Sequence, residues 1–81
     1  MSRLFNTIEK VEKILRQECY VSDNIKVYPH TSVTRDLGID TDDISFYFIP
    51  ALHKEFNKKL SSKKWSELET VEQIARAFSE E

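Results

Sequence analysis

The sequence predicts an all-α fold, a small helical bundle with three main helices, one short helix and a long first loop. Its three main segments repeat apolar residues at intervals of three and four positions, which is the spacing of an amphipathic helix. No segment is predicted to form a strand. Only one glycine and two prolines occur in 81 residues, which argues against a disordered or loop-rich chain.

The first predicted helix lies within "NTIEKVEKILRQECYV", residues 6–21. Its charged residues fall on the side opposite an apolar stripe. This stripe consists of Leu4, Ile8, Val11, Ile14, Leu15 and Cys19. Asn6 followed by Glu9 fits a capping box, and a start nearer Ser2 is the alternative.

Residues 22–35, "SDNIKVYPHTSVTR", carry turn formers and isolated apolar residues without a sustained period. We therefore expect a long ordered loop, and loops of this length are uncommon unless they are functional. The residues expected to attach the loop to the core are Ile25, Val27, Tyr28 and Val33.

A second helix is predicted from apolar residues that recur every four positions. They are Ile44, Phe48, Leu52 and Phe56. Asp40 or Thr41 caps the start, and Asp42 and Asp43 occupy the first turn, where negative charge is favourable.

Pro50 lies in the interior of this second predicted helix. A proline there removes one backbone hydrogen bond and costs about 3 kcal/mol. We therefore expect a kink near Ile49 or a break in the helix.

The end of the chain predicts a short helical turn and a final helix. The turn falls within "LSSKKWSEL", residues 60–68. Thr70 and Gln73 form a capping box at the start of the final helix. The buried face of that helix is expected to consist of Val71, Ile74, Ala75 and Phe78.

Composition narrows the classes of function. The net charge of −2 argues against nucleic acid as a partner, because such binding needs a basic surface. One cysteine forms no internal disulfide, which indicates a reducing compartment. The chain shows no apolar run of signal-peptide or membrane-spanning length. We expect one domain over residues 1–81, monomeric, cytoplasmic, bacterial and not associated with a membrane.

Catalytic patterns are weak. Cys19 with His30 or His53 would supply a nucleophile and a base, but nothing fixes either pair in space. Cys19 also falls on the apolar stripe, where a free cysteine is usually a small buried hydrophobe. A small bundle offers no deep cleft that excludes water. We therefore do not expect an enzyme.

The acidic segment "DLGIDTDD", residues 36–43, does not match a calcium-binding loop. Such a loop needs glycine at its sixth position and glutamate at its twelfth. Counting from Asp36 gives Thr41 and Tyr47 at these positions, and counting from Asp40 fails as well. Helix capping accounts for the aspartates, so we expect no metal site.

"DLGID", between a long loop and a helix, resembles the acyl carrier protein family, whose pattern at this point is D-L-G-x-D-S-L. Three other segments, "TIEKVEKIL", "ALHKEFNKKL" and "ETVEQIARAF", resemble its first, second and final helices. The resemblance covers nearly the whole chain. It implies a four-helix bundle in which a serine at the start of the second helix carries 4′-phosphopantetheine. The thiol of this arm holds an acyl group, while an acidic second helix docks on basic patches of partner enzymes.

The chain departs from this pattern at the serine. Counting forward from Gly38 places Thr41 there, and counting back from Phe56 places Asp42, so this segment is one residue longer than the pattern. The β-branch of Thr41 crowds its hydroxyl, and Ser45 comes about one helical turn too late. Positive charge also replaces the family's usual acidity at His53, Lys54, Lys58 and Lys59.

The leading hypothesis is an acyl-carrier-like domain that is not phosphopantetheinylated, needs no cofactor and binds a protein partner of unknown identity. Acyl-transfer enzymes are candidate partners. Consecutive helical positions point in different directions, so Phe46, Tyr47 and Phe48 cannot all be buried. The predicted partner surface consists of Asp36, Asp40, Thr41, Asp42, Asp43, Phe46 and Tyr47.

The alternative is a functional carrier with 4′-phosphopantetheine on Thr41, and Ser45 is a less favoured attachment residue. In that case Asp40 would help to hold magnesium in the transferase complex. A small enzyme or a nucleic-acid binder is a third, disfavoured class.

Overall fold

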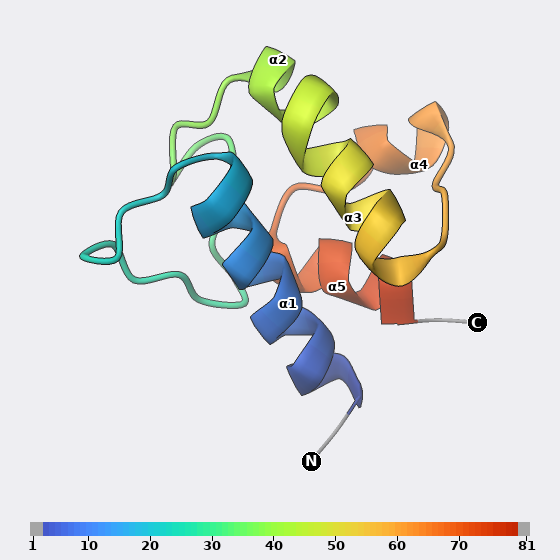
Figure 1. Cartoon of the computed structure of the whole chain (residues 1–81), viewed down its shortest axis with the longest axis horizontal. Helices are drawn as coiled ribbons and strands as arrows, with labels where there is room; N and C mark the ends of the chain where they lie inside the picture. The colour runs from blue at the N-terminus through green and yellow to red at the C-terminus, as the bar shows by residue number, and fades with distance from the viewer. Residues whose placement is uncertain (1–2, 80–81) are drawn as a thin grey trace.

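The computed structural model describes residues 3–79, and the predicted all-α fold is confirmed (Figure 1). The elements are α1 (Arg3–Glu18), α2 (Thr41–Asp43), the π-helical segment η1 (Ile44–Phe48), α3 (Ile49–Phe56), α4 (Ser62–Ser66) and α5 (Val71–Ser79). The elements α2, η1 and α3 follow one another without a gap and form the second helix of the bundle. Within the described residues, the one strand-like pairing is a single bridge between Ser32 and Thr70.

The core lies where α1 packs against α5 and where η1 and α3 contact α1. The largest fully buried side chains are Val11, Leu15, Phe48, Leu52, Val71 and Ile74. Burying an aliphatic or phenyl side chain contributes roughly 1.5–3 kcal/mol relative to leaving it exposed, so this small set accounts for much of the driving force for folding.

The start of the first helix differs from the prediction. The chain is already helical at Arg3, so Asn6 lies inside α1 and the proposed Asn6–Glu9 capping box is wrong. Packing of Leu4 against the core favours the extra turn, and the hydroxyl of Thr7 donates to the Arg3 carbonyl at 2.9 Å. The alternative start at Ser2 lies outside the described residues.

Arg16 holds the long loop against α1. Its guanidinium donates to the carbonyls of Ser22 and Ile25 at 2.6 and 2.9 Å. The same group pairs with the Glu12 carboxylate at 2.9 Å. Hydrogen bonds to the backbone therefore order the first half of the loop.

Two of the four apolar residues expected to attach the loop do so. Val33 is buried and Val27 is partly buried against the core. Ile25 and Tyr28 are 45% and 48% exposed, so their predicted anchoring role is wrong. The ring of Tyr28 instead stacks on His30 with the ring centroids 5.4 Å apart.

The two C-terminal elements follow the prediction. Ser61 caps α4 by accepting a hydrogen bond from the Lys64 amide. The capping box of α5 is complete, because the Gln73 amide donates to the Thr70 hydroxyl at 3.2 Å and the Thr70 amide donates to the Gln73 side chain at 3.0 Å. The buried face of α5 contains Val71, Ile74, Ala75 and Phe78, as expected, together with Ala77.

Candidate partner-binding site at the start of the second helix

A short turn brings the chain to the start of α2. Gly38 adopts a left-handed conformation with φ +66°, which glycine reaches at little cost. The Asp36 carboxylate accepts a hydrogen bond from the Ser32 amide at 2.8 Å, which fixes the turn against the loop. Asp36 therefore has a structural contact, while its side chain remains exposed on the predicted partner surface.

Asp40 is the N-cap of α2, and Thr41 is its first residue. The Asp40 carbonyl accepts the first helical hydrogen bond, from the Ile44 amide at 3.1 Å, although the Asp40 side chain makes no capping bond. Thr41, Asp42 and Asp43 are all exposed. The helix start thus presents a hydroxyl flanked by carboxylates to solvent.

The extra residue of this segment is accommodated by η1. The Ile49 amide donates to the Ile44 carbonyl, five residues earlier, so this turn holds one residue more than an α-helical turn. Pro50 follows at the start of α3, where the wider turn eases the clash that a proline ring makes with the carbonyl four residues before it. Helical conformation continues to Phe56, so the predicted break is wrong, the kink near Ile49 stays a prediction, and the offset forms a π turn.

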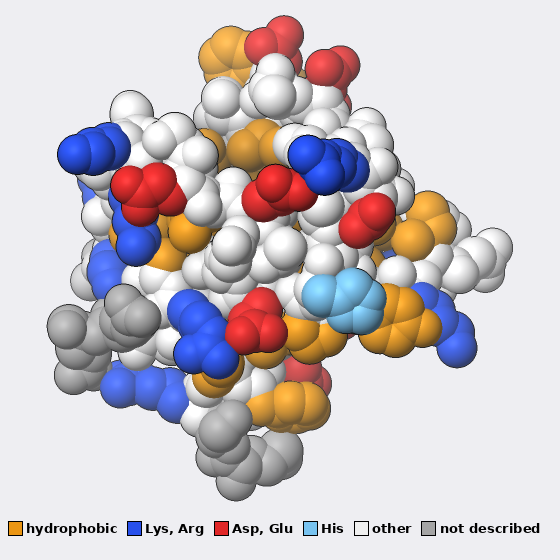
Figure 2. Space-filling model, turned by 180° about the vertical axis from the view of Figure 1, so that it is seen from behind, with side chains coloured by type: hydrophobic (Ala, Val, Ile, Leu, Met, Phe, Trp, Pro, Cys, Tyr) orange, Lys and Arg blue, Asp and Glu red, His pale blue; other side chains and the backbone are white. Residues whose placement is uncertain are grey.

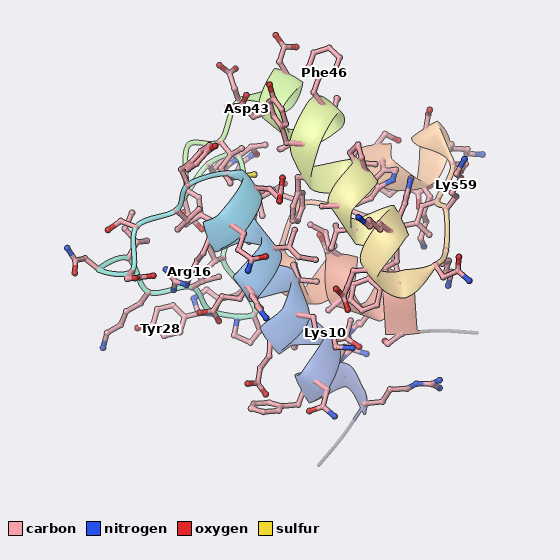
Figure 3. All side chains as sticks on the ribbon, in the orientation of Figure 1. Lys10, Arg16, Tyr28, Asp43, Phe46 and Lys59 are labelled. Atoms are coloured by element: carbon pink, nitrogen blue, oxygen red, sulfur yellow. The ribbon has the colours of Figure 1, made fainter. Side chains whose placement is uncertain are left out.

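The three consecutive aromatic residues, Phe46, Tyr47 and Phe48, are not all buried, as predicted. Phe46 and Tyr47 are 71% and 55% exposed, whereas Phe48 is fully buried. Figure 3 shows Asp43 and Phe46 projecting from the same end of the molecule. Acidic and aromatic side chains therefore share the surface at this end.

A groove joins this helix start to the end of α1. Its volume is about 450 Å³, and it is lined by Glu18, Tyr20, Asp43 and Tyr47. Tyr20 is 88% exposed and has a left-handed backbone with φ +57° just beyond α1. Glu18 and Tyr20 were absent from the predicted surface. The only sequence signal was that Tyr20 lies off the apolar stripe, near the end of the first predicted helix.

The electrostatic potential at this groove is negative, and it affects the pKa of the nearby Cys19 thiol. Burial raises the pKa of the Cys19 thiol to about 11, and the negative charges of Asp43 and Glu18 act in the same direction. The thiol therefore stays protonated at neutral pH and is a poor nucleophile. His30 stacks on the ring of Tyr28, and the ring of His53 lies tilted by 52° against that of Trp65, with the ring centroids 6.2 Å apart.

A second cavity, of about 290 Å³, lies on the other side of the helix start. Thr41 and Ser45 contribute to its wall from the second helix, and Trp65 contributes from α4. Among residues 3–79, no group of three or more His, Cys, Asp or Glu side chains is arranged to hold a metal ion.

Comparison with known proteins identifies relatives of the chain, although no family model matches it. The chain is 34% identical over 74 residues to a chloroplastic acyl carrier protein of Brassica napus. It is 32% identical over 74 residues to the chloroplastic acyl carrier protein SF2 of Brassica campestris. Each match covers 91% of this chain and 54% of the relative, so the chain spans about half the length of the curated relatives it matches.

The expected cytoplasmic location is contradicted by these relatives, whose names place them in the chloroplast. The expected bacterial origin finds no support among them either. A single cysteine limits the redox environment but does not identify a compartment. Of the helices in the described part of the chain, none combines the length and apolar character needed to cross a membrane.

The relatives are named as carrier proteins rather than enzymes, in agreement with the prediction that the chain is not an enzyme. Its helical fold has the long first loop that the resemblance implied, and its second helix has acidic residues in the first turn. This fold, together with the matches over most of its length, relates the chain to the acyl carrier protein family.

Proposed function

We propose that this acyl-carrier-like domain is not phosphopantetheinylated and acts as a protein–protein interaction module. The observation that carries the proposal is a threonine flanked by carboxylates at the exposed start of α2. If η1 holds the extra residue, the spacing before it matches the family's pattern. Counting forward from Gly38 then puts Thr41 at the attachment position. That residues 1–81 form one monomeric domain stays a prediction.

The residues at this position do not fit a phosphopantetheine arm. The Thr41 hydroxyl is on a secondary, β-branched carbon, which restricts the side chain at χ1. A phosphodiester there would add negative charge beside the exposed carboxylate of Asp42, which stands where the family's pattern has leucine, and neighbouring like charges repel. Ser45 lies one turn later within η1. No cofactor is therefore part of the proposal.

The groove between α1 and η1 supports a cationic partner. A guanidinium group can stack on a tyrosine ring and donate paired hydrogen bonds to a carboxylate. Tyr20 and Tyr47 supply the rings, and Glu18 and Asp43 supply the carboxylates. The partner proposed is a protein that presents an arginine to this groove, and acyl-transfer enzymes are the candidate class.

Nucleic acid is not the proposed partner. Figure 2 shows Lys and Arg side chains interspersed with Asp and Glu on the face of the molecule away from the viewer of Figure 1. Such a face lacks the continuous positive surface on which phosphate binding depends. The net charge of −2 agrees with this interpretation.

The first test is intact mass after incubation with coenzyme A, magnesium and a promiscuous phosphopantetheinyl transferase. We expect no mass gain for the wild-type chain. A gain by a Thr41→Ser variant would show that the transferase still docks and that only the nucleophile is missing. A wild-type gain that Thr41→Ala abolishes would overturn the proposal.

The second test addresses the partner surface. Candidate acyl-transfer enzymes are titrated against wild-type chain and against Tyr47→Ala and Asp43→Asn. Both variants should bind at least roughly tenfold more weakly, the range expected for a residue central to an interface. Tyr28→Ala is the matched control, because Tyr28 is also exposed and Figure 3 places it away from Asp43. Equal loss in the control would refute the surface assignment.

One observation favours the second candidate function, a carrier modified on Thr41. Thr41 borders the cavity of about 290 Å³, so an attached group could reach apolar walls directly. In this version Asp40 would lie next to the magnesium of the transferase complex. The same mass measurement separates the two candidates.

A further inference from the structure

Positive charge is concentrated along the end of α3, the connection to α4, and α4 itself. With His53 neutral, residues 53–66 contain five lysines and one glutamate, so this segment carries a charge of +4 within a chain whose net charge is −2. The glutamate, Glu55, pairs with Lys10 of α1 at 3.7 Å. The lysines of the segment therefore have no acidic residue of their own to neutralise them.

Four of these lysines are exposed, and none of the four forms an ion pair with any of residues 3–79. They are Lys54, Lys59, Lys63 and Lys64, and together they make up the basic surface. By contrast, Arg16, Arg35 and Arg76 each pair with a glutamate. Figure 2 shows Lys and Arg side chains along the left edge of the molecule, the edge at which α4 lies when it is seen from behind.

Hydrogen bonds fix the backbone that carries the basic surface. The ammonium group of Lys58, the fifth lysine, donates to the Ala77 carbonyl of α5 at 2.8 Å. The Leu60 amide donates to the His53 ring at 3.3 Å, and Ser61 caps α4. The four free ammonium groups are therefore held on an ordered connection, which lowers the entropy that is lost when a partner binds.

The residues around the basic surface favour one kind of partner. Phe56, Leu60 and Trp65, the large apolar residues of the connection and of α4, pack against the core. Membrane binding needs apolar side chains that enter the lipid, and single-stranded nucleic acid stacks its bases on aromatic rings. A duplex is disfavoured by the rest of the chain, whose charge is −6. Lysines act as separate point charges, so the basic surface fits several spaced carboxylates.

We propose that the basic surface is a second interface, which binds an acidic segment of a partner protein. Its four ammonium groups lie against carboxylates that are spread along that segment. The interface goes beyond the proposed function, because it is separate from the groove between α1 and η1 and has the opposite charge. Figure 3 places Asp43 at the start of the second helix and Lys59 beyond the end of α3.

The test uses two dye-labelled peptides that differ in charge. One repeats the sequence Glu-Glu-Ser-Gly, and the other repeats Gln-Gln-Ser-Gly over the same length. In fluorescence anisotropy at low ionic strength, the wild-type chain should bind the glutamate peptide roughly tenfold more tightly, as several exposed ion pairs imply. Added salt should weaken this binding, because it screens exposed charges. A labelled DNA duplex is the third probe, and it should bind more weakly than the glutamate peptide.

Two double variants assign the binding to the basic surface. Lys59→Gln with Lys63→Gln should weaken binding of the glutamate peptide roughly two- to tenfold. Lys13→Gln with Lys26→Gln removes the same charge from exposed positions on α1 and the first loop, so it should weaken binding less. All four positions are exposed, so the core is unchanged, and circular dichroism checks that each variant folds.

Three results would each overturn the proposal. They are equal binding of the two peptides, equal losses in the two double variants, and binding of the duplex as tight as that of the glutamate peptide. The comparison of the probes needs only the wild-type chain, so it decides even where a variant does not fold. The experiment contains no coenzyme A, transferase or acyl-transfer enzyme, and its failure would leave the proposed function standing.

Discussion

At the scale of single residues, His53 shows how a local contact sets a protonation state. Burial lowers the pKa of His53 below its usual 6.5, and the nearby positive charge of Lys59 lowers this pKa further. Nε2 accepts a hydrogen bond from the Leu60 amide, which only the neutral ring can do. The neutral imidazole therefore helps to hold the chain where it leaves α3 for α4.

This lowered pKa predicts a pH dependence of stability. The unfolded chain binds a proton at His53 near pH 6.5, whereas the folded chain resists it. The contribution to the free energy of unfolding is fully present above pH 6.5 and is lost as the pH falls through the lower, folded pKa. Urea unfolding at several pH values measures this slope. His53→Gln should reduce the slope, and a slope unchanged by this substitution would contradict the prediction.

Gly38 is the residue whose conformation sets up the helix start. Its φ is +66°, and an added Cβ would meet no atom within 4 Å, so a substitution there is opposed by backbone strain alone. We expect Gly38→Ala to lower the free energy of unfolding by about 1–2 kcal/mol. Gly38→Asn should cost less, because asparagine tolerates the left-handed region. Urea unfolding of both variants is the measurement, and equal losses would point to a cause other than backbone strain.

At the scale of elements, η1 explains the spacing of the apolar stripe. Ile44, Phe48, Leu52 and Phe56 are separated by uniform steps of four residues. On a regular α-helix each such step overshoots a full turn by about 40°, so the stripe would drift away from the core. One wider turn corrects this drift, and Phe48 and Leu52 are both fully buried as a result. The uniform spacing was thus a sequence signal for the π turn.

Because Pro50 directly follows the π turn, η1 and Pro50 should be energetically coupled. Deleting Phe46, which is 71% exposed, should convert η1 into a regular turn and place Pro50 against an α-helical carbonyl at a cost of about 3 kcal/mol. The same deletion in a Pro50→Ala background should cost much less. Urea unfolding of the wild-type chain, the two single variants and the double variant gives the coupling free energy from a double-mutant cycle. Additive effects would show that Pro50 and the π turn are independent.

Local patterns in the sequence predicted most elements but not the contacts between them. The Thr70–Gln73 box and the Asp40–Thr41 helix start depend on neighbouring residues, and both could be predicted. The groove could not, because Glu18 and Tyr20 meet η1 only through tertiary packing. The predicted Asn6–Glu9 capping box was wrong for the same reason, because packing of Leu4 against the core extends the helix beyond Asn6 toward the N-terminus.

At the scale of the whole molecule, charge is distributed unevenly although the net charge is only −2. Figure 3 shows Asp43 beside the start of the second helix and Lys59 at the far end of α3. The acidic groove therefore lies away from the lysine-rich connection between α3 and α4. Such a separation of charge orients a molecule as it approaches a charged partner.

The groove predicts recognition of a cation in preference to a neutral isostere. N-acetylarginine amide and N-acetylcitrulline amide have similar shapes, but only the first is charged. We expect the arginine compound alone to shift the amide signals of Tyr20 and Tyr47, because two carboxylates line the same groove. Raising the salt concentration from about 0.05 to 0.5 M should weaken this binding, since the Debye length falls well below 10 Å.

Two variants separate the contribution of charge to this binding from the contribution of ring stacking. Asp43→Asn should weaken the binding of the arginine compound and reduce its salt dependence, because one charge of the pair is removed. Tyr47→Ala should weaken the binding and keep the salt dependence, because it removes a stacking surface and no charge. Lys63→Gln, on the exposed side of α4, is the control for a general change in net charge. If the citrulline compound binds as well as the arginine compound, the groove recognises shape rather than charge, and the cationic partner is the wrong class.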